Sequence, residues 1–293
     1  MPVTYDAVQG GPYNLAVVSS ASTHTKGSYV EVDASTSIAA DGFFLTLSAA
    51  DTGGRVYLLD IATGAASSEV VVVANLPYQV GNEYHMANSC VYIPLVIAAG
   101  TRLSARCQCS TGTSSLFISV TLVNGGLASL LESTIAHTFG ANTGTSTGTS
   151  IDPGAVANTK GAYSQLTAAT STTNQIRWLL VMVGSRGDTS LATCTWALDI
   201  ATGAAASEVV IVPDLVFATL GTAADGPLPS TFCVPVEIPT GTRLSARAKC
   251  TSIAATDRLI DLIVVGIEGV SQVAGGGDAF TVVQRVVGSG LIG

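Results

Sequence analysis

The clearest pattern along the chain is a strict alternation of polar and apolar positions. Within Gly100–Arg106 (GTRLSAR), the polar residues Arg102, Ser104 and Arg106 alternate with apolar ones. Successive side chains of a strand point to opposite faces, so a period of two predicts a half-buried β-strand. The same seven letters return at Gly241–Arg247. The pattern therefore predicts two equivalent strands, one in each half of the chain.

A second matched pair shows that most of the chain is duplicated. Asp60–Leu76 reads DIATGAASSEVVVVANL and Asp199–Leu215 reads DIATGAAASEVVIVPDL, with 13 of 17 positions identical. The copies are 139 residues apart here and 141 residues apart at GTRLSAR. A repeat of this length is a whole domain rather than a solenoid unit or a propeller blade. We therefore expect two homologous domains that share one fold.

The remaining apolar runs have the length of strands and are separated by turn residues. Glu69–Val73 is apolar on both faces, which is typical of a strand between two layers. A single helical turn competes for ATGAAS within the repeat, because alanine favours helices. Seven or eight short strands in each domain predict an all-β chain of two tandem homologous β-sandwich (jelly-roll-like) domains with extended N- and C-terminal arms. The other expected strands are Gly42–Ser48, Val91–Ile97, Leu116–Val123, Ile176–Val183 and Leu259–Val265.

Glycine-rich breaks set the expected domain boundaries. Between the domains, Gly125–Ala136 is the best helix candidate, although an interdomain strand explains it equally, and Gly140–Gly154 has the composition of a flexible linker. A terminal strand beyond a glycine hinge can pair with a neighbour, so we expect the two arms to dock the protein or link subunits. The expected segments are an N-terminal arm (1–20), sandwich one (21–125), an interdomain segment and linker (126–155), sandwich two (156–268) and a C-terminal arm (269–293).

Charge and hydropathy narrow the classes of partner. The 293 residues carry a net charge of −8 without a basic stripe, which argues against nucleic acid. The mean hydropathy is +0.49, yet no run approaches the roughly 20 apolar residues of a membrane span. The start of the chain lacks the features of a signal peptide. We expect a soluble protein without membrane insertion.

Only 11% of the residues are charged. Interface cores are depleted in charge, so a surface this poor in charge predicts partial cover by other subunits. We therefore expect a homo-oligomer. The analogy to other jelly-roll proteins suggests a trimer.

The cysteines do not form a metal-binding pattern. Zinc requires four clustered ligands, and Cys107 of the first copy is replaced by Ala248 in the second. We expect no metal and no cofactor, and we expect buried free thiols. Disulfides joining Cys90 to Cys107 or Cys233 to Cys250 are the alternative.

The charged residues kept in both copies are the candidates for a site. A structural salt-bridge network between neighbouring strands is the favoured interpretation, because arginine and carboxylate pair well. A subunit contact, or a sugar-binding or glycosidase cleft, is the alternative. Lys26 and Lys160 also recur, and we expect them in a turn or a rim salt bridge. The structural candidates are Asp60, Glu69, Arg102 and Arg106 in the first copy, and Asp199, Glu208, Arg243 and Arg247 in the second.

No catalytic constellation is visible. None of His24, His85 and His137 recurs in the other copy, and the common nucleophile, metalloprotease and nucleotide-binding motifs are absent. The sequence therefore predicts a protein that is not an enzyme and has no catalytic residue. The loops Pro77–Ala87 and Val216–Ser230 differ between the copies and are the expected places for a specific binding surface.

Three motifs in order resemble β-rich domains of structural proteins from tailed bacteriophages. They are TKGxY, then DIATGAAxSEVV, then GTRLSAR, and they recur in both copies at Thr25–Val32, Asp60–Val73, Ile97–Arg106, Thr159–Leu166, Asp199–Val212 and Ile238–Arg247. The resemblance covers nearly all of both domains but carries no functional residue. It implies a non-enzymatic virion component of the tail fibre, the baseplate or the capsid decoration.

The expected localisation is thus the virion, after synthesis in the host bacterial cytoplasm, with other virion proteins as partners. The alternative is a carbohydrate-binding module that recognises a host surface glycan. A glycan depolymerase is the third interpretation, and it would require a carboxylate pair that the sequence does not display.

Overall fold

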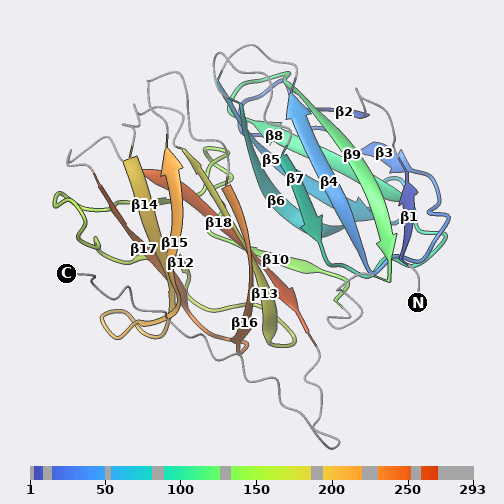
Figure 1. Ribbon diagram of the computed structural model, residues 1–293. Coiled ribbons are helices and arrows are strands. Elements are labelled where there is room, and N and C mark those ends of the chain that lie inside the picture. Colours follow the sequence, from blue (N-terminus) through green and yellow to red (C-terminus); the bar gives the residue numbers. More distant parts are fainter. Residues whose placement is uncertain are drawn as a thin grey trace, which may run out of the picture.

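The computed structural model consists of two β-sandwiches that lie side by side (Figure 1). This confirms the predicted all-β class and the tandem sandwiches. The alternation of short apolar strands with glycine- and threonine-rich turns is the reason for both. The structure describes residues 3–8, 15–49, 54–80, 89–125, 133–185, 194–219, 230–251 and 259–269.

The first sandwich is built from residues of the first copy. Its outer sheet has the order β1-β9-β4-β7, with β2 also paired to β9: β1 (Thr4–Ala7), β9 (Ser115–Asn124), β4 (Gly42–Ala49), β7 (Ser89–Ile93) and β2 (Leu15–Val18). The facing sheet has the order β6-β5-β8-β3: β6 (Val70–Val80), β5 (Arg55–Thr63), β8 (Leu103–Cys109) and β3 (Val30–Asp33).

The second sandwich repeats this arrangement. One sheet has the order β12-β17-β14-β15: β12 (Ser164–Thr167), β17 (Leu244–Cys250), β14 (Cys194–Thr202) and β15 (Val209–Thr219). The other contains β16-β13-β18, with β11 also paired to β18: β16 (Ser230–Ile238), β13 (Ile176–Ser185), β18 (Ile260–Glu268) and β11 (Thr149–Ile151).

A single short strand, β10 (Ala136–Phe139), joins the two sandwiches. It pairs antiparallel with β18 of the second sandwich and parallel with β6 of the first, where Ala136 lies opposite Val73. The result is one nine-stranded sheet that runs through both domains, with β10 near its middle (Figure 1).

Apolar packing between the domains reinforces this sheet. Each sandwich has its own core, but the first core also takes in five side chains from β13 and β18 of the second sandwich, namely Leu180, Met182, Ile263, Val265 and Ile267. All five are 5% exposed or less. Burying five such side chains contributes on the order of 10 kcal/mol of transfer free energy. The domains are therefore packed as one unit.

The structure places parts of the expected arm and linker inside the sandwiches. Residues 1–20 contribute β1 and β2, both paired to β9, rather than a detached arm. The segment 126–155 contributes β10 and β11. The helix candidate Gly125–Ala136 falls mostly on residues 126–132, which lie outside the described residues. Residues 270–293 of the expected C-terminal arm also lie outside them.

No helix occurs at ATGAAS. Strand β5 ends at Thr63, and Gly64 then turns the chain with a φ of 102°. Within the ranges given above, no helical segment has the length and apolar character needed to cross a bilayer.

Candidate functional site: a duplicated lysine–aspartate–arginine cluster

A β-bulge sets the position of the first recurring carboxylate. Leu59 pairs with Leu76 and Ile61 pairs with Val73, so Asp60 on β5 stands opposite two residues of β6 rather than one. One of these two residues is Asn75, which has a φ of 54°. A bulge of this kind redirects backbone groups, and here the Asn75 N–H points at the Asp60 carboxylate.

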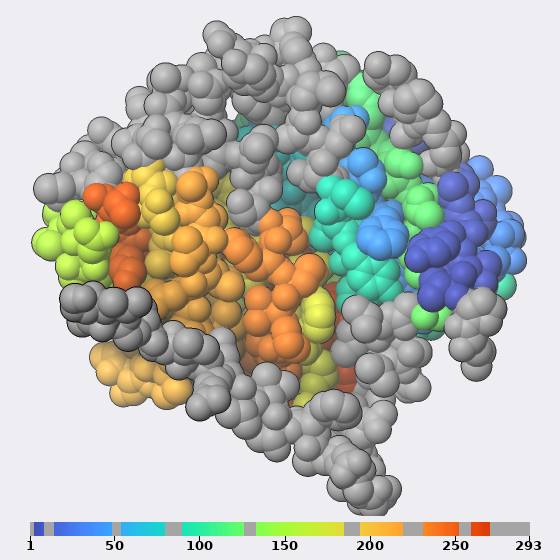
Figure 2. All heavy atoms as spheres, in the orientation of Figure 1, coloured from blue at the N-terminus to red at the C-terminus, as the bar shows by residue number. Residues whose placement is uncertain are grey.

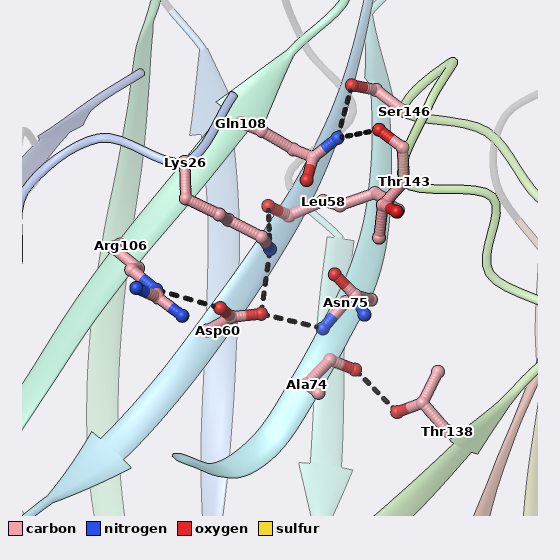
Figure 3. A network of polar contacts seen from close by, with 10 residues as sticks. All are labelled: Lys26, Leu58, Asp60, Ala74, Asn75, Arg106, Gln108, Thr138, Thr143 and Ser146. Carbon is pink, nitrogen blue, oxygen red and sulfur yellow. Dashed lines mark hydrogen bonds and ion pairs between the residues drawn. The ribbon is translucent and has the colours of Figure 1, made fainter. Parts of the chain in front are cut away.

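Asp60 is 3% exposed and accepts from three donors (Figure 3). Lys26 Nζ lies 2.7 Å from Oδ1, Arg106 Nε lies 3.0 Å from Oδ2, and the Asn75 N–H donates to Oδ1 over 2.9 Å. Lys26 also donates to the carbonyl oxygen of Leu58 over 3.0 Å. A buried carboxylate requires this degree of compensation, because desolvation otherwise disfavours its charge.

The second copy builds the same cluster around Asp199. Lys160 Nζ lies 2.7 Å and Arg247 Nε 3.0 Å from its oxygens, and the Asp214 N–H donates over 3.0 Å. Lys160 again donates to a backbone carbonyl, that of Ala197. One difference is the residue on the bulge, since Asp214 adds its own carboxylate 2.8 Å from Lys160.

The TKGxY motif supplies two further parts of each cluster. The guanidinium carbon of Arg106 lies 4.5 Å from the centre of the Tyr29 ring, and Arg247 stands at the same distance from Tyr163. Such a cation–π contact holds the arginine in place over the carboxylate. The motif glycine, Gly27, donates its N–H to the Cys107 carbonyl, which draws the motif against β8.

A second arginine in each copy fastens the turn that follows β5 or β14. Arg102 binds Glu69 over 3.2 Å, the Gly64 carbonyl over 3.1 Å and the exposed Glu31 over 2.9 Å. The second copy uses Arg243 with Glu208, the Gly203 carbonyl and Gln165. Glu69 and Glu208 are thus committed to the arginine that spans the turn, whereas Asp60 and Asp199 belong to the bulge.

The surroundings shift the pKa of Asp199 in the second cluster and of Lys26 in the first. Burial raises the pKa of Asp199, but the bonds from the Asp214 N–H, Lys160 and Arg247 outweigh it, so the net pKa lies below the ordinary value. In the first copy, burial lowers the pKa of Lys26, and the charge and hydrogen bond of Asp60 offset this only in part. Both charged forms are held by their neighbours rather than by water.

Acid should therefore loosen the second cluster. Because the folded pKa of Asp199 lies below its unfolded value of about 3.9, its contribution to stability is complete above that pH and is lost as the pH falls through the folded pKa. Urea unfolding at a series of pH values should show the decline, and Asp199→Asn should flatten this part of the profile. An identical profile for the variant would contradict the assignment.

The described residues give these clusters no evident reactive group. Within the ranges seen in the structure, no three His, Cys, Asp or Glu side chains are arranged to hold a metal ion. All six cysteines are free thiols, and Cys90 and Cys233 are exposed while the other four are buried. Burial raises the pKa of the Cys107 thiol to about 12, so it remains protonated at neutral pH.

The structure places the eight charged candidates in four ion pairs, two in each sandwich: one pair at the bulge and one at the turn. Sequence reasoning expected the recurring lysine in a turn or a rim salt bridge and did not join it to the buried aspartate. It missed the tyrosine and the residue on the bulge. Lys26 and Tyr29 recur as Lys160 and Tyr163, so their repetition was a usable signal. The loops expected to bind a ligand, Pro77–Ala87 and Val216–Ser230, fall largely outside the described residues.

Comparison with known proteins yields structural likenesses of low similarity. No protein-family model and no curated protein sequence matches the chain. One structural likeness is to the solved structure of PNGase F from Flavobacterium meningosepticum, described as a glycosylasparaginase. It is 10% identical to this chain with a TM-score of 0.39, and the match covers 91% of this chain and 97% of the PNGase F chain.

Two further solved structures match with similarly low identity. PNGF-II is 8% identical with a TM-score of 0.38, and the match covers 91% of this chain and 66% of the PNGF-II chain. A tandem of CBM22 domains from Paenibacillus barcinonensis Xyn10C is 8% identical with a TM-score of 0.24, covering 92% of this chain and 91% of the tandem.

The prediction that this chain is not an enzyme is contradicted by the PNGase F neighbours and is withdrawn. At these TM-scores the likeness assigns no activity to the chain. The prediction rested on the absence of known catalytic motifs and of a carboxylate pair, and such an absence does not exclude an activity.

Proposed function

We propose that the chain is a structural component of a bacteriophage virion surface, of the tail-fibre, baseplate or capsid-decoration type. The observation that carries the proposal is the nine-stranded sheet that makes the two sandwiches one block. An accessory subunit on a particle must keep its shape under load, and a sheet shared between domains resists hinge motion. The motifs that resemble phage structural domains point the same way.

The recurring charges support this role. Asp60 and Asp199 each bind a lysine, an arginine and a backbone N–H of their own sandwich. Residues kept in both copies therefore stabilise the common fold, and the low charge of the remaining surface suits contact with other proteins.

Quantitative mass spectrometry of purified particles tests the proposal. The phage that encodes this chain should carry it in a fixed ratio to the major capsid protein, and gold-labelled antibody should mark the head, the tail or the baseplate. A protein abundant in infected cells but absent from purified particles would overturn the proposal.

A further inference from the structure

The two sandwiches contact each other through different surfaces. The first sandwich uses the outer face of β8, β5 and β6, here called the β6 surface, which includes Val56, Pro77, Gln79 and Gln108. The second uses the outer face of β13 and β18 together with β10, here called the β18 surface. Its side chains that join the core cluster of the first sandwich include Ala136, Leu180, Met182, Ile263 and Val265. Side chains from both surfaces line one cavity between the domains, among them Pro77, Gln79, Met182 and Ile263.

Hydrogen bonds add to the apolar contact between the domains. Gln108 is 2% exposed and donates to the Thr143 carbonyl over 2.7 Å and to Ser146 Oγ over 2.9 Å (Figure 3). Nearby, Thr138 Oγ1 of β10 donates to the Ala74 carbonyl of β6. The contact thus combines apolar packing with buried hydrogen bonds.

Because the domains are copies, each must possess a counterpart of the surface that its partner uses. Backbone pairing fixes the correspondence. Leu15 pairs with Ile118 and Thr149 pairs with Leu262. Leu15 and Thr149 are 134 residues apart, as are Lys26 and Lys160. Positions on β9 and β18 therefore correspond at a spacing of 144 residues.

The second sandwich carries an open counterpart of the β6 surface, here called the β15 surface. Val216 corresponds to Pro77 at the 139-residue spacing and is 61% exposed. Lys249 corresponds to Gln108 at the 141-residue spacing, and its side chain is 37% exposed. Thr195, which corresponds to the buried Val56, is exposed as well.

The first sandwich carries an open counterpart of the β18 surface, here called the β9 surface. Phe44 pairs with Thr121 in the first sandwich as Leu180 pairs with Val265 in the second, so Phe44 corresponds to Leu180. Leu180 is fully buried, whereas Phe44 is 37% exposed. By the same register Tyr5 corresponds to Ala136, and the exposed fraction rises from 5% to 62%.

Within the described part of the chain, two strand edges lack a pairing partner at the same two places. β10 pairs with β18 on one side and β6 on the other. Among the residues that the structure describes, its counterpart β1 pairs only with β9, and β15, the counterpart of β6, pairs only with β14. β1 and β15 lie in different sandwiches, toward opposite ends of the molecule (Figures 1 and 2).

We infer that the chain associates head to tail with a second copy of itself, the β15 surface of one copy binding the β9 surface of the next. This repeats between chains the contact that already joins the two sandwiches within a chain. The surfaces differ, so the contact is heterologous and propagates into a closed ring or an open filament. The inference rests on the proposed role as a building block and names its partner.

The contact between chains should be weaker than the one within a chain. Met182, Ile263 and Val265 of the β18 surface correspond to Thr46, Ser119 and Thr121 on the β9 surface. These hydroxyl side chains contribute less apolar area, while Phe44, Tyr5 and Val216 retain apolar anchors. A more polar surface keeps the free chain in solution and makes association depend on concentration.

Sedimentation velocity and light scattering on the purified full chain, over a series of concentrations, form the first test. We expect the mass to rise with concentration. Val216→Asp and Tyr5→Asp should each weaken association by roughly 100-fold or more, because each places an unpaired charge in the contact. Both side chains are over 60% exposed, so the folds should persist in circular dichroism.

Val209→Asp is the matched control. Val209 lies on β15 and is 64% exposed, and its counterpart Val70 is 58% exposed although β6 is in contact with the second sandwich. This position therefore lies outside the contact, and its substitution should leave association unchanged.

Mixing the two interface variants gives the decisive result. Val216→Asp retains its β9 surface and Tyr5→Asp retains its β15 surface, so an equimolar mixture should form a one-to-one dimer and stop there. A monomer at every concentration, a Tyr5→Asp protein that still self-associates, or a mixture that stays monomeric would overturn the inference. A monomeric protein that is still found in particles would contradict the self-association and leave the virion role supported. Self-association without incorporation into particles would contradict the virion role and leave the self-association supported.

Discussion

Replacing Asp60 with alanine is expected to lower the free energy of unfolding of the protein by about 3–5 kcal/mol, because it leaves the charges of two partly buried partners without their carboxylate. Lys26 and Arg106 would lose their shared carboxylate, and the Asn75 N–H would lose its acceptor. The melting temperature should fall by roughly 10 °C or more. Denaturant unfolding followed by circular dichroism measures the change.

Glu31→Ala is the control for this substitution. Glu31 also forms an ion pair, with Arg102 over 2.9 Å, but its side chain is 52% exposed. Solvent screens such a pair, so this substitution should leave the melting temperature nearly unchanged. Equal losses for Asp60→Ala and Glu31→Ala would show that burial does not decide the strength of these pairs.

Replacing Gly27 with alanine is expected to cost about 3 kcal/mol, the upper part of the range for overpacking. A Cβ atom at this position would overlap the Val18 carbonyl oxygen, a backbone atom that cannot rotate away. The second copy repeats the constraint, because a Cβ on Gly161 would overlap the carbonyl oxygen of Asp152. We expect comparable losses for both variants in thermal unfolding.

Gly100→Ala separates crowding from backbone strain. Gly100 has a φ of 77°, and a Cβ there would meet no atom within 4 Å. Only the left-handed conformation is penalised, at a cost of about 1 kcal/mol. If Gly27→Ala were no more destabilising than Gly100→Ala, the close approach of the TKGxY motif to β2 would not be a constraint on the fold.

The candidate cluster could be read only in part from the sequence. Repetition singled out Asp60 and Arg106, and the period of two placed Arg106 on the polar face of its strand. Lys26 was assigned to a turn or a rim because nothing local shows that its side chain reaches Asp60, 34 residues later. The role of Asn75 depends on a bulge, which is a property of two paired strands and not of either sequence alone.

The sequence by itself determined the main strands of each sandwich, the duplication and the sandwich class, because alternation and turn residues act over a few positions and were present twice. The tertiary structure alone decided how the copies meet. β10 is four residues long and has no distinctive pattern, and its partners β6 and β18 lie far from it along the chain. Which surfaces a duplicated domain covers, and which counterparts it leaves open, follows from that long-range pairing.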